Sequence, residues 1–137
     1  MGRPTRAAGF TLLEIMIVVF IVGLLATLVA PRLMGRTDEA RRVKATADLA
    51  TIAQALDLYR LDSGVYPTTA QGLAALVTRP TTAPVPRAWR DGGYVDQLPP
   101  DPWGNPYVYV ATGDRFVLKS LGGDGVEGGE GNAADVQ

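Results

Sequence analysis

The side chains that could do chemistry in this chain are acidic, hydroxylic or basic, because its 137 residues include neither histidine nor cysteine. Disulfides, thiolate metal sites and imidazole catalysis are therefore excluded. Two carboxylates can act together as acid and base, and the candidate pairs are Asp57 with Asp62 and Asp124 with Asp135. No nucleophile motif accompanies either pair, and one small domain offers little room for a deep pocket. We therefore expect a protein that is not an enzyme.

A glycine-rich acidic segment follows Leu121 and offers a second kind of chemistry. Glycine occupies six of the ten positions from 122 to 131, and carboxylates lie between these glycines. Carboxylate and carbonyl oxygens are the hard ligands that calcium takes six to eight of. A disordered polar terminus has the same composition, and the spacing does not fit an EF-hand. Composition thus leaves open both a calcium loop and a disordered tail.

A single carboxylate, Glu14, lies near the start of an apolar stretch that runs from Phe10 to Ala30. An acidic side chain inside a membrane helix costs about 2.5 to 3.5 kcal/mol on insertion scales and usually marks a functional position. Glu14 then needs a partner. The alternative is that it lies close enough to the membrane surface to be solvated.

The apolar stretch itself is long enough, as a helix, to span roughly 30 Å of hydrocarbon. An ordinary secretory signal peptide would also have basic residues such as Arg3 and Arg6 before an apolar core. This core is too long for that class, and no A-x-A cleavage site follows it. We therefore expect a membrane helix.

The elements behind these residues form an α+β pattern. Apolar residues recur at spacings of three and four up to Ser63, where Gly64 follows, and predict an amphipathic second half of one long helix. Thr68 and Gln71 predict a capping box for a short helix that ends before Pro80.

The rest of the chain is predicted to form a loop and a hairpin. Residues 80–106 are rich in proline, which excludes long regular elements, although Trp89, Tyr94 and Trp103 can anchor this loop to a core. Residues 107–111 and 115–121 predict two antiparallel strands joined by a turn at 112–114. Because a lone hairpin is marginally stable, we expect it to pack on the long helix.

The boundary between the basic leader and the apolar stretch reads Gly9-Phe10-Thr11-Leu12-Leu13-Glu14, which resembles the processing motif of type IV pilins and pseudopilins. The resemblance implies that a membrane prepilin peptidase cuts between Gly9 and Phe10 and methylates the new amine of Phe10. It also implies that the Glu14 carboxylate meets the positively charged N-terminus of a neighbouring subunit. An opposite charge about 4 Å away is worth several kcal/mol at an effective dielectric near 20.

The resemblance extends over nearly the whole mature chain and narrows to the major pseudopilins of the type II secretion system. The segments that carry it are Met34-Gly35-Arg36, residues 38–42, residues 58–62 with Gly64, residues 66–69, residues 71–73, residues 98–99 and residues 101–107. It implies a cleaved leader at 1–9, a transmembrane and filament-core helix at 10–34, and a periplasmic domain at 35–137. The long helix would pack on a small antiparallel sheet with a calcium-stabilised loop.

The function implied is that of a structural subunit. Many copies would polymerise into a periplasmic pseudopilus that supports export of folded proteins across the outer membrane. The implied partners are other copies of the chain, minor pseudopilins, the prepilin peptidase, membrane lipid before assembly, and an inner-membrane assembly platform with a separate cytoplasmic ATPase. Five basic residues follow the apolar stretch and two precede it, so the charge rule alone favours the opposite topology.

Two other functions remain open at this stage. One is a type IV pilin for adhesion, motility or DNA uptake, and the other is a monomeric, membrane-anchored calcium-binding protein. The net charge of −1 gives no electrostatic reason to expect nucleic acid as a partner.

The resemblance also implies a ligand set for calcium. Asp124 and Asp135 would contribute carboxylates, and Leu121 and Val126 would contribute backbone carbonyl oxygens. The remaining ligands stay open among Glu127, Gly129, Glu130 and Asn132.

Overall fold

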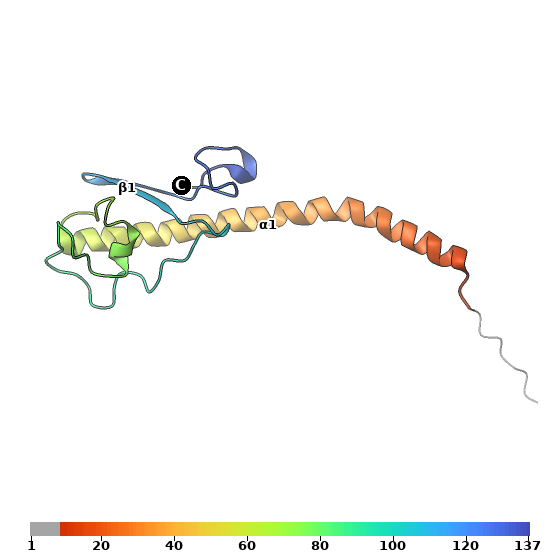
Figure 1. Ribbon diagram of the computed structural model, residues 1–137, viewed down its shortest axis with the longest axis horizontal. Helices are drawn as coiled ribbons and strands as arrows, with labels where there is room; N and C mark the ends of the chain where they lie inside the picture. The colour runs from red at the N-terminus through yellow and green to blue at the C-terminus, as the bar shows by residue number, and fades with distance from the viewer. Residues whose placement is uncertain (1–8) are drawn as a thin grey trace, which may run out of the picture. The chain divides into compact units, whose positions relative to one another are not determined.

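The computed structural model describes residues 9–137, and the side chains of residues 29–36 and of Asn132 are not included. Most of the predicted leader, residues 1–8, thus lies outside the described residues. The chain divides into two compact units between Thr37 and Asp38. Helix α1, Leu12–Ser63, is followed by a short 3₁₀ helix, two strands and a second 3₁₀ turn (Figure 1).

Helix α1 begins and ends at residues whose chemistry favours those positions. At its start, the hydroxyl of Thr11 accepts the backbone N–H of Glu14 at 3.2 Å, and the carbonyl of Thr11 accepts that of Ile15. At its end, Gly64 takes a φ of 84°, which glycine adopts without strain. The predicted long helix that ends at Ser63 is confirmed.

The first unit contains the predicted membrane-spanning half of this helix. Over the described residues, no helix is both long enough and apolar enough to cross a membrane. The side chains of residues 29–36, which belong partly to the predicted span at 10–34, lie outside the description.

The core of the second unit is built on the apolar stripe of α1. Ala45, Leu49, Ile52, Leu56 and Tyr59 are all buried, and their spacing of three and four places them on one face of the helix. The predicted amphipathic stripe is confirmed. It packs against a cluster that includes Leu76, Tyr107, Tyr109 and Val136.

A two-stranded antiparallel sheet covers part of this face. Strands β1, Val108–Thr112, and β2, Arg115–Lys119, pair in register around a two-residue connection, Gly113 and Asp114. Tyr109, Ala111, Phe116 and Leu118 belong to the core cluster or pack against it. The predicted hairpin is confirmed, although β1 is shifted by one residue.

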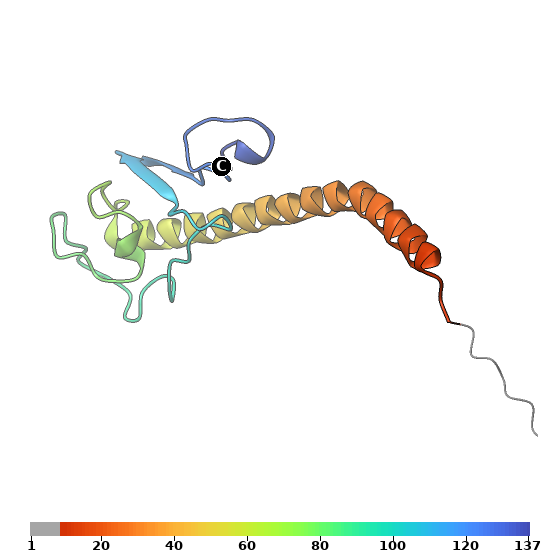
Figure 2. The same ribbon diagram turned by 45° about the vertical axis from the view of Figure 1, so that its right-hand side comes forward.

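The predicted extension of the second strand to Leu121 is wrong. Strand β2 ends at Lys119, because the backbone of Ser120 pairs with Val136 of the tail rather than with β1. The Ser120 N–H donates to the Val136 carbonyl at 2.9 Å, and the reciprocal bond is 3.0 Å long. The tail therefore returns to the sheet, as the blue segment in Figure 2 shows.

The segment between α1 and the hairpin confirms the predicted capping box. The Gln71 N–H donates to the Thr68 hydroxyl at 3.2 Å, and the Thr68 N–H donates to the Gln71 side-chain oxygen at 3.0 Å. The helix that follows is only a 3₁₀ turn, Leu73–Leu76.

Aromatic side chains anchor the loop that comes next. Trp89 contacts Tyr94 edge to face, and its indole N–H donates to the Ala75 carbonyl at 3.1 Å. Tyr94 lies against Tyr59 of α1, with 5.4 Å between the ring centroids. The proline-rich loop is thus held on the helix by the aromatic residues that the sequence singles out.

Candidate functional site

The predicted cleavage position lies in an exposed segment that precedes α1. Gly9 and Phe10 are outside the helix and exposed, and Phe10 is 79% exposed. An exposed peptide bond outside regular secondary structure is the form that peptidases act on. The geometry is compatible with cleavage between these two residues.

Glu14 lies in the first turn of α1 and is exposed. Among the residues that the structure describes, no cation pairs with its carboxylate. The large apolar side chains from Phe10 to Leu28 are all exposed too. A contiguous apolar surface of this kind marks a surface that associates with another molecule or with lipid.

The predicted calcium ligands lie in the tail, but the two carboxylates among them form hydrogen bonds in two different turns. Oδ1 of Asp124 accepts the Val126 N–H at 3.1 Å, within its own exposed turn. Asp135 instead closes a different turn, in which its Oδ1 accepts the Gly128 N–H at 3.1 Å. Leu121 is half-buried and Val126 is exposed.

Over the described residues, no three acidic side chains gather into a metal-binding group. The calcium site stays a prediction. Of the residues left open as ligands, Glu127 contacts the ammonium of Lys119, and Gly129 approaches the Ala133 carbonyl so closely that an added Cβ would lie 2.4 Å from it. Glu130 is exposed, and the side chain of Asn132 lies outside the described residues.

Lys119 is a residue of this region that sequence reasoning missed. Its ammonium pairs with the carboxylates of Glu127 and Asp135, and the residue is only 8% exposed. The hydrogen bond to Glu127, followed by that to Asp135, raises the pKa of Lys119. The signal in the sequence was a lysine at the end of an apolar strand, directly before an acidic tail.

Arg42 is a second cation that binds the tail, from the side of α1. Its guanidinium donates to the carbonyl of Gly131 at 2.9 Å and to that of Ala134 at 3.1 Å. Arg41, Arg42 and Lys44 form a basic cluster in the sequence. Arg41 and Lys44 make exposed pairs with acidic neighbours on the helix, whereas Arg42 reaches the tail.

A buried carboxylate, Asp101, connects the proline-rich loop to the start of the tail. Its Oδ1 accepts the N–H groups of Trp103 and Asn105, at 3.1 and 2.7 Å, and its Oδ2 accepts the Ser120 hydroxyl at 2.5 Å. The Asn105 amide then donates to the Gly122 carbonyl at 3.3 Å. Part of the 101–107 segment that carries the family resemblance is thus a structural junction.

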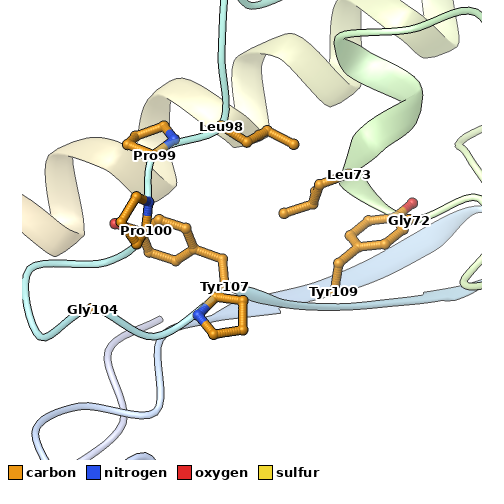
Figure 3. A pocket seen from close by; sticks show the side chains of 9 residues that line it. Gly72, Leu73, Leu98, Pro99, Pro100, Gly104, Tyr107 and Tyr109 are labelled. Atoms are coloured by element: carbon orange, nitrogen blue, oxygen red, sulfur yellow. The ribbon is translucent and has the colours of Figure 1, made fainter.

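Neither candidate acid/base pair is assembled by these contacts. Asp57 accepts the Tyr66 hydroxyl at 2.7 Å, and Asp62 accepts the Tyr94 hydroxyl at 2.8 Å. A surface groove of about 490 Å³ lies elsewhere, and leucine, proline, glycine and tyrosine line it (Figure 3). The hydroxyls of its tyrosines are bound to Asp48 and to the Pro67 carbonyl. Among the described residues, no carboxylate or amine lines this groove, and both of its tyrosine hydroxyls are already hydrogen-bonded.

The chain is similar to known proteins over both of its parts. Residues 32–137 match the family described as Type II secretion system (T2SS), protein G, and residues 4–30 match the prokaryotic N-terminal methylation motif. Two relatives are each named type II secretion system core protein G. That of Vibrio cholerae is 51% identical and the match covers 99% of this chain and 94% of the relative. That of Pseudomonas aeruginosa is 54% identical over 96% of this chain and 94% of the relative.

A solved structure agrees with these relatives. The fold resembles the crystal structure of the major pseudopilin from the type 2 secretion system of enterohaemorrhagic Escherichia coli, with a TM-score of 0.67 and 45% sequence identity. The match covers 77% of this chain and 92% of that chain.

Proposed function

The chain belongs to the type II secretion system protein G family, and on this premise we propose that it is the structural subunit that polymerises into a periplasmic pseudopilus. The pseudopilus supports export of folded proteins across the outer membrane. A single observation carries the proposal. An exposed Gly9-Phe10 segment directly precedes a helix whose large apolar side chains are exposed up to Leu28.

Assembly follows from the chemistry of the first turn. Once the leader is removed, the amine of Phe10 is a positive charge beside an apolar helix. A neighbouring subunit offers the Glu14 carboxylate, and the two charges offset each other when both are withdrawn from water. Cleavage also removes Arg3 and Arg6, which would hold the end of the helix at the cytoplasmic headgroups.

Before assembly, residues 10–34 are the segment that would anchor the chain in the inner membrane, with residues 35–137 in the periplasm. The match to the N-terminal methylation motif supports this topology over the one that the basic residues after the segment would favour. The exposed apolar side chains would then contact lipid until they pack against other subunits.

In this function the chain has no catalytic role. Asp57 and Asp62 act as acceptors for tyrosine hydroxyls that hold the loop on α1. Processing would require a prepilin peptidase, and assembly would require the platform in the inner membrane with its cytoplasmic ATPase. Minor pseudopilins would complete the filament.

Calcium is the second part of the proposal. The tail offers only hard oxygen donors: the carboxylates of Asp124 and Asp135 and the carbonyls of Leu121 and Val126. Its glycines let the backbone approach closely, since a Cβ on Gly122 would lie 2.8 Å from the Ala134 carbonyl oxygen. Bound calcium would supply a divalent charge that holds the tail carboxylates together.

The calcium proposal is tested by thermal unfolding of the full chain in detergent micelles, with and without calcium. Binding only to the folded form raises the melting temperature by mass action. We expect Asp124→Ala to reduce this rise, whereas Asp114→Ala, in the exposed hairpin turn, keeps it. An equal rise in all three proteins would remove Asp124 from the site.

Mass spectrometry of the mature N-terminus tests the subunit function. We expect the chain to lack residues 1–9 and to carry a methyl group on the Phe10 amine. Glu14→Gln should be processed in the same way but assemble poorly, because its amide cannot neutralise the amine. A full-length leader in cells that contain the peptidase would contradict the proposal.

A further inference from the structure

Lys119 is a lysine with almost no exposure, and this needs an explanation. Lysine is almost never buried unless its charge is paired. The side chain of Lys119 is 10% exposed, whereas that of Lys44, the chain's other lysine, is 56% exposed. The position at the end of β2 thus places an ammonium in a partly closed site that the tail completes.

The carboxylates that face this ammonium both belong to the tail. Oδ2 of Asp135 lies 3.1 Å from Nζ of Lys119, and the carboxylate of Glu127 contacts the same atom. The Asp135 side chain is only 14% exposed. One ammonium therefore joins two points of the tail that are eight residues apart in the sequence.

The same contacts fix the turn between those two points. Oδ1 of Asp135 accepts the Gly128 N–H, while the Asp135 N–H donates to the Gly128 carbonyl at 3.2 Å. Asp135 is thus held by the backbone of Gly128 and by the ammonium of Lys119 at the end of β2. Arg42, the second cation on the tail, adds two contacts, to the carbonyls of Gly131 and Ala134.

From this arrangement we infer that Lys119 is a built-in counter-cation of the tail, which occupies Asp135 and must leave it when calcium binds there. The second half of the statement rests on the proposed calcium site. The reason is electrostatic. The ammonium lies 3.1 Å from Oδ2 of Asp135, so a divalent ion bound to the same carboxylate would lie close to it. Two positive charges that close together repel strongly in a partly closed site. Calcium and the ammonium therefore compete for one carboxylate.

The competition has a defined direction. Without metal, Lys119 keeps the tail closed, so the tail does not depend on calcium alone. With metal, the ammonium is displaced toward solvent. Because coupling between two binding events is reciprocal, removing the ammonium should tighten calcium binding by about tenfold.

Amine labelling of the full chain in detergent micelles tests the first half directly. Lys44 and Lys119 are modified by an acylating reagent and quantified by mass spectrometry. In a chelator, we expect Lys119 to react at least about tenfold more slowly than Lys44, because its amine is paired and covered. Equal rates for the two lysines would overturn the inference.

Calcium titration tests the second half, with Lys119→Met, Lys119→Arg and Lys44→Met as variants. Lys119→Met should bind calcium about tenfold more tightly, whereas Lys119→Arg and Lys44→Met should bind like the unchanged chain. Calcium should also speed labelling of Lys119 in the unchanged chain. If calcium binds and neither the labelling rate nor the affinity of Lys119→Met changes, the competition is wrong.

These measurements separate the two proposals. If Lys119 is protected in the chelator and no protein binds calcium, the calcium site fails, and with it the displacement of Lys119, while the lysine closure of the tail stands. If Lys119 is labelled freely and calcium binds, the calcium site stands and the counter-cation fails. The labelling experiment compares two lysines of the unchanged chain, so its result does not depend on whether any variant folds.

Discussion

The hydroxyl of Ser120 donates to Oδ2 of Asp101 at 2.5 Å, and both residues are buried. This bond connects the end of the proline-rich loop to the point where strand β2 gives way to the tail. Three donors converge on one carboxylate there, so the junction depends on a single side chain.

Asp101→Ala should destabilise the second unit by about 3 kcal/mol, because one buried donor and two partly buried donors lose their acceptor. Urea unfolding of the full chain in detergent micelles, followed by tryptophan fluorescence, measures the loss. Asp91→Ala, at an exposed position of the preceding loop, is the matched control and should change little. A loss below about 1 kcal/mol for Asp101→Ala would mean that water replaces the carboxylate at little cost.

Arg42→Ala should loosen the tail and leave the rest of the core intact. The guanidinium provides two donors to tail carbonyls, and alanine provides none. Hydrogen exchange of the tail amides should accelerate by about tenfold, which reports local opening. The neighbouring Arg41→Ala removes only an exposed pair with Asp38 and should leave tail exchange unchanged. Equal exchange of the tail amides in both variants would show that the Arg42 hydrogen bonds do not hold the tail closed.

Gly122→Ala should cost more stability than Gly131→Ala, although both glycines have a similar positive φ, 67° and 59°. Left-handed backbone costs a residue with a Cβ about 1–2 kcal/mol at either position. Only at Gly122 would that Cβ also lie 2.8 Å from a backbone oxygen, that of Ala134. Urea midpoints of the two variants give the comparison. Equal midpoints would show that the tail shifts freely to make room.

Stability should fall in alkali as the tyrosines of the second unit ionise. Burial, assisted by Asp62, raises the pKa of Tyr94 to about 12, and burial raises that of Tyr109 to about 12. Burial and the bond to Asp48 also raise the pKa of Tyr107. The folded pKa lies above the unfolded value of 10.0, so this stability is complete below pH 10 and is lost as pH rises through about 12.

Ultraviolet absorbance of tyrosinate, recorded with circular dichroism across this pH range, checks the prediction. The late-titrating tyrosines should ionise together with unfolding. Tyr109→Phe removes one of these ionisations. Between neutral pH and about pH 12 this variant should therefore lose less stability than the unchanged chain loses over the same range. Titration of all five tyrosines near their ordinary pKa, with the fold retained, would contradict it.

The sequence predicted those elements whose signals are local. Periodicity up to Ser63, the Thr68 and Gln71 pair and the two strand-like segments each depend on neighbours a few residues apart, and all three were confirmed. The end of β2 was misplaced because its cause is distant. Ser120 pairs with Val136, and no local pattern reports such a partner.

The functional residues divide in the same way. Gly9, Phe10 and Glu14 form one contiguous motif, which the matched methylation motif supports. Lys119 and Arg42 could not be assigned from sequence, since each binds groups that only folding brings near. Asp135 lies 16 positions after Lys119 in the sequence, and Ala134 lies 92 positions after Arg42. The calcium ligands stay a prediction for the same reason.

The pairing of Ser120 with Val136 sets an order of events in biogenesis. Val136 is buried against a core whose helix is synthesised first, and the Arg42 contact to Ala134 joins the two ends of the second unit. The tail therefore closes only after the whole second unit has been synthesised, because its partners lie at both ends of that unit. A chain that stopped before Ala134 would still contain the helix and the hairpin, but it would lack the backbone groups that bind Ser120 and Arg42.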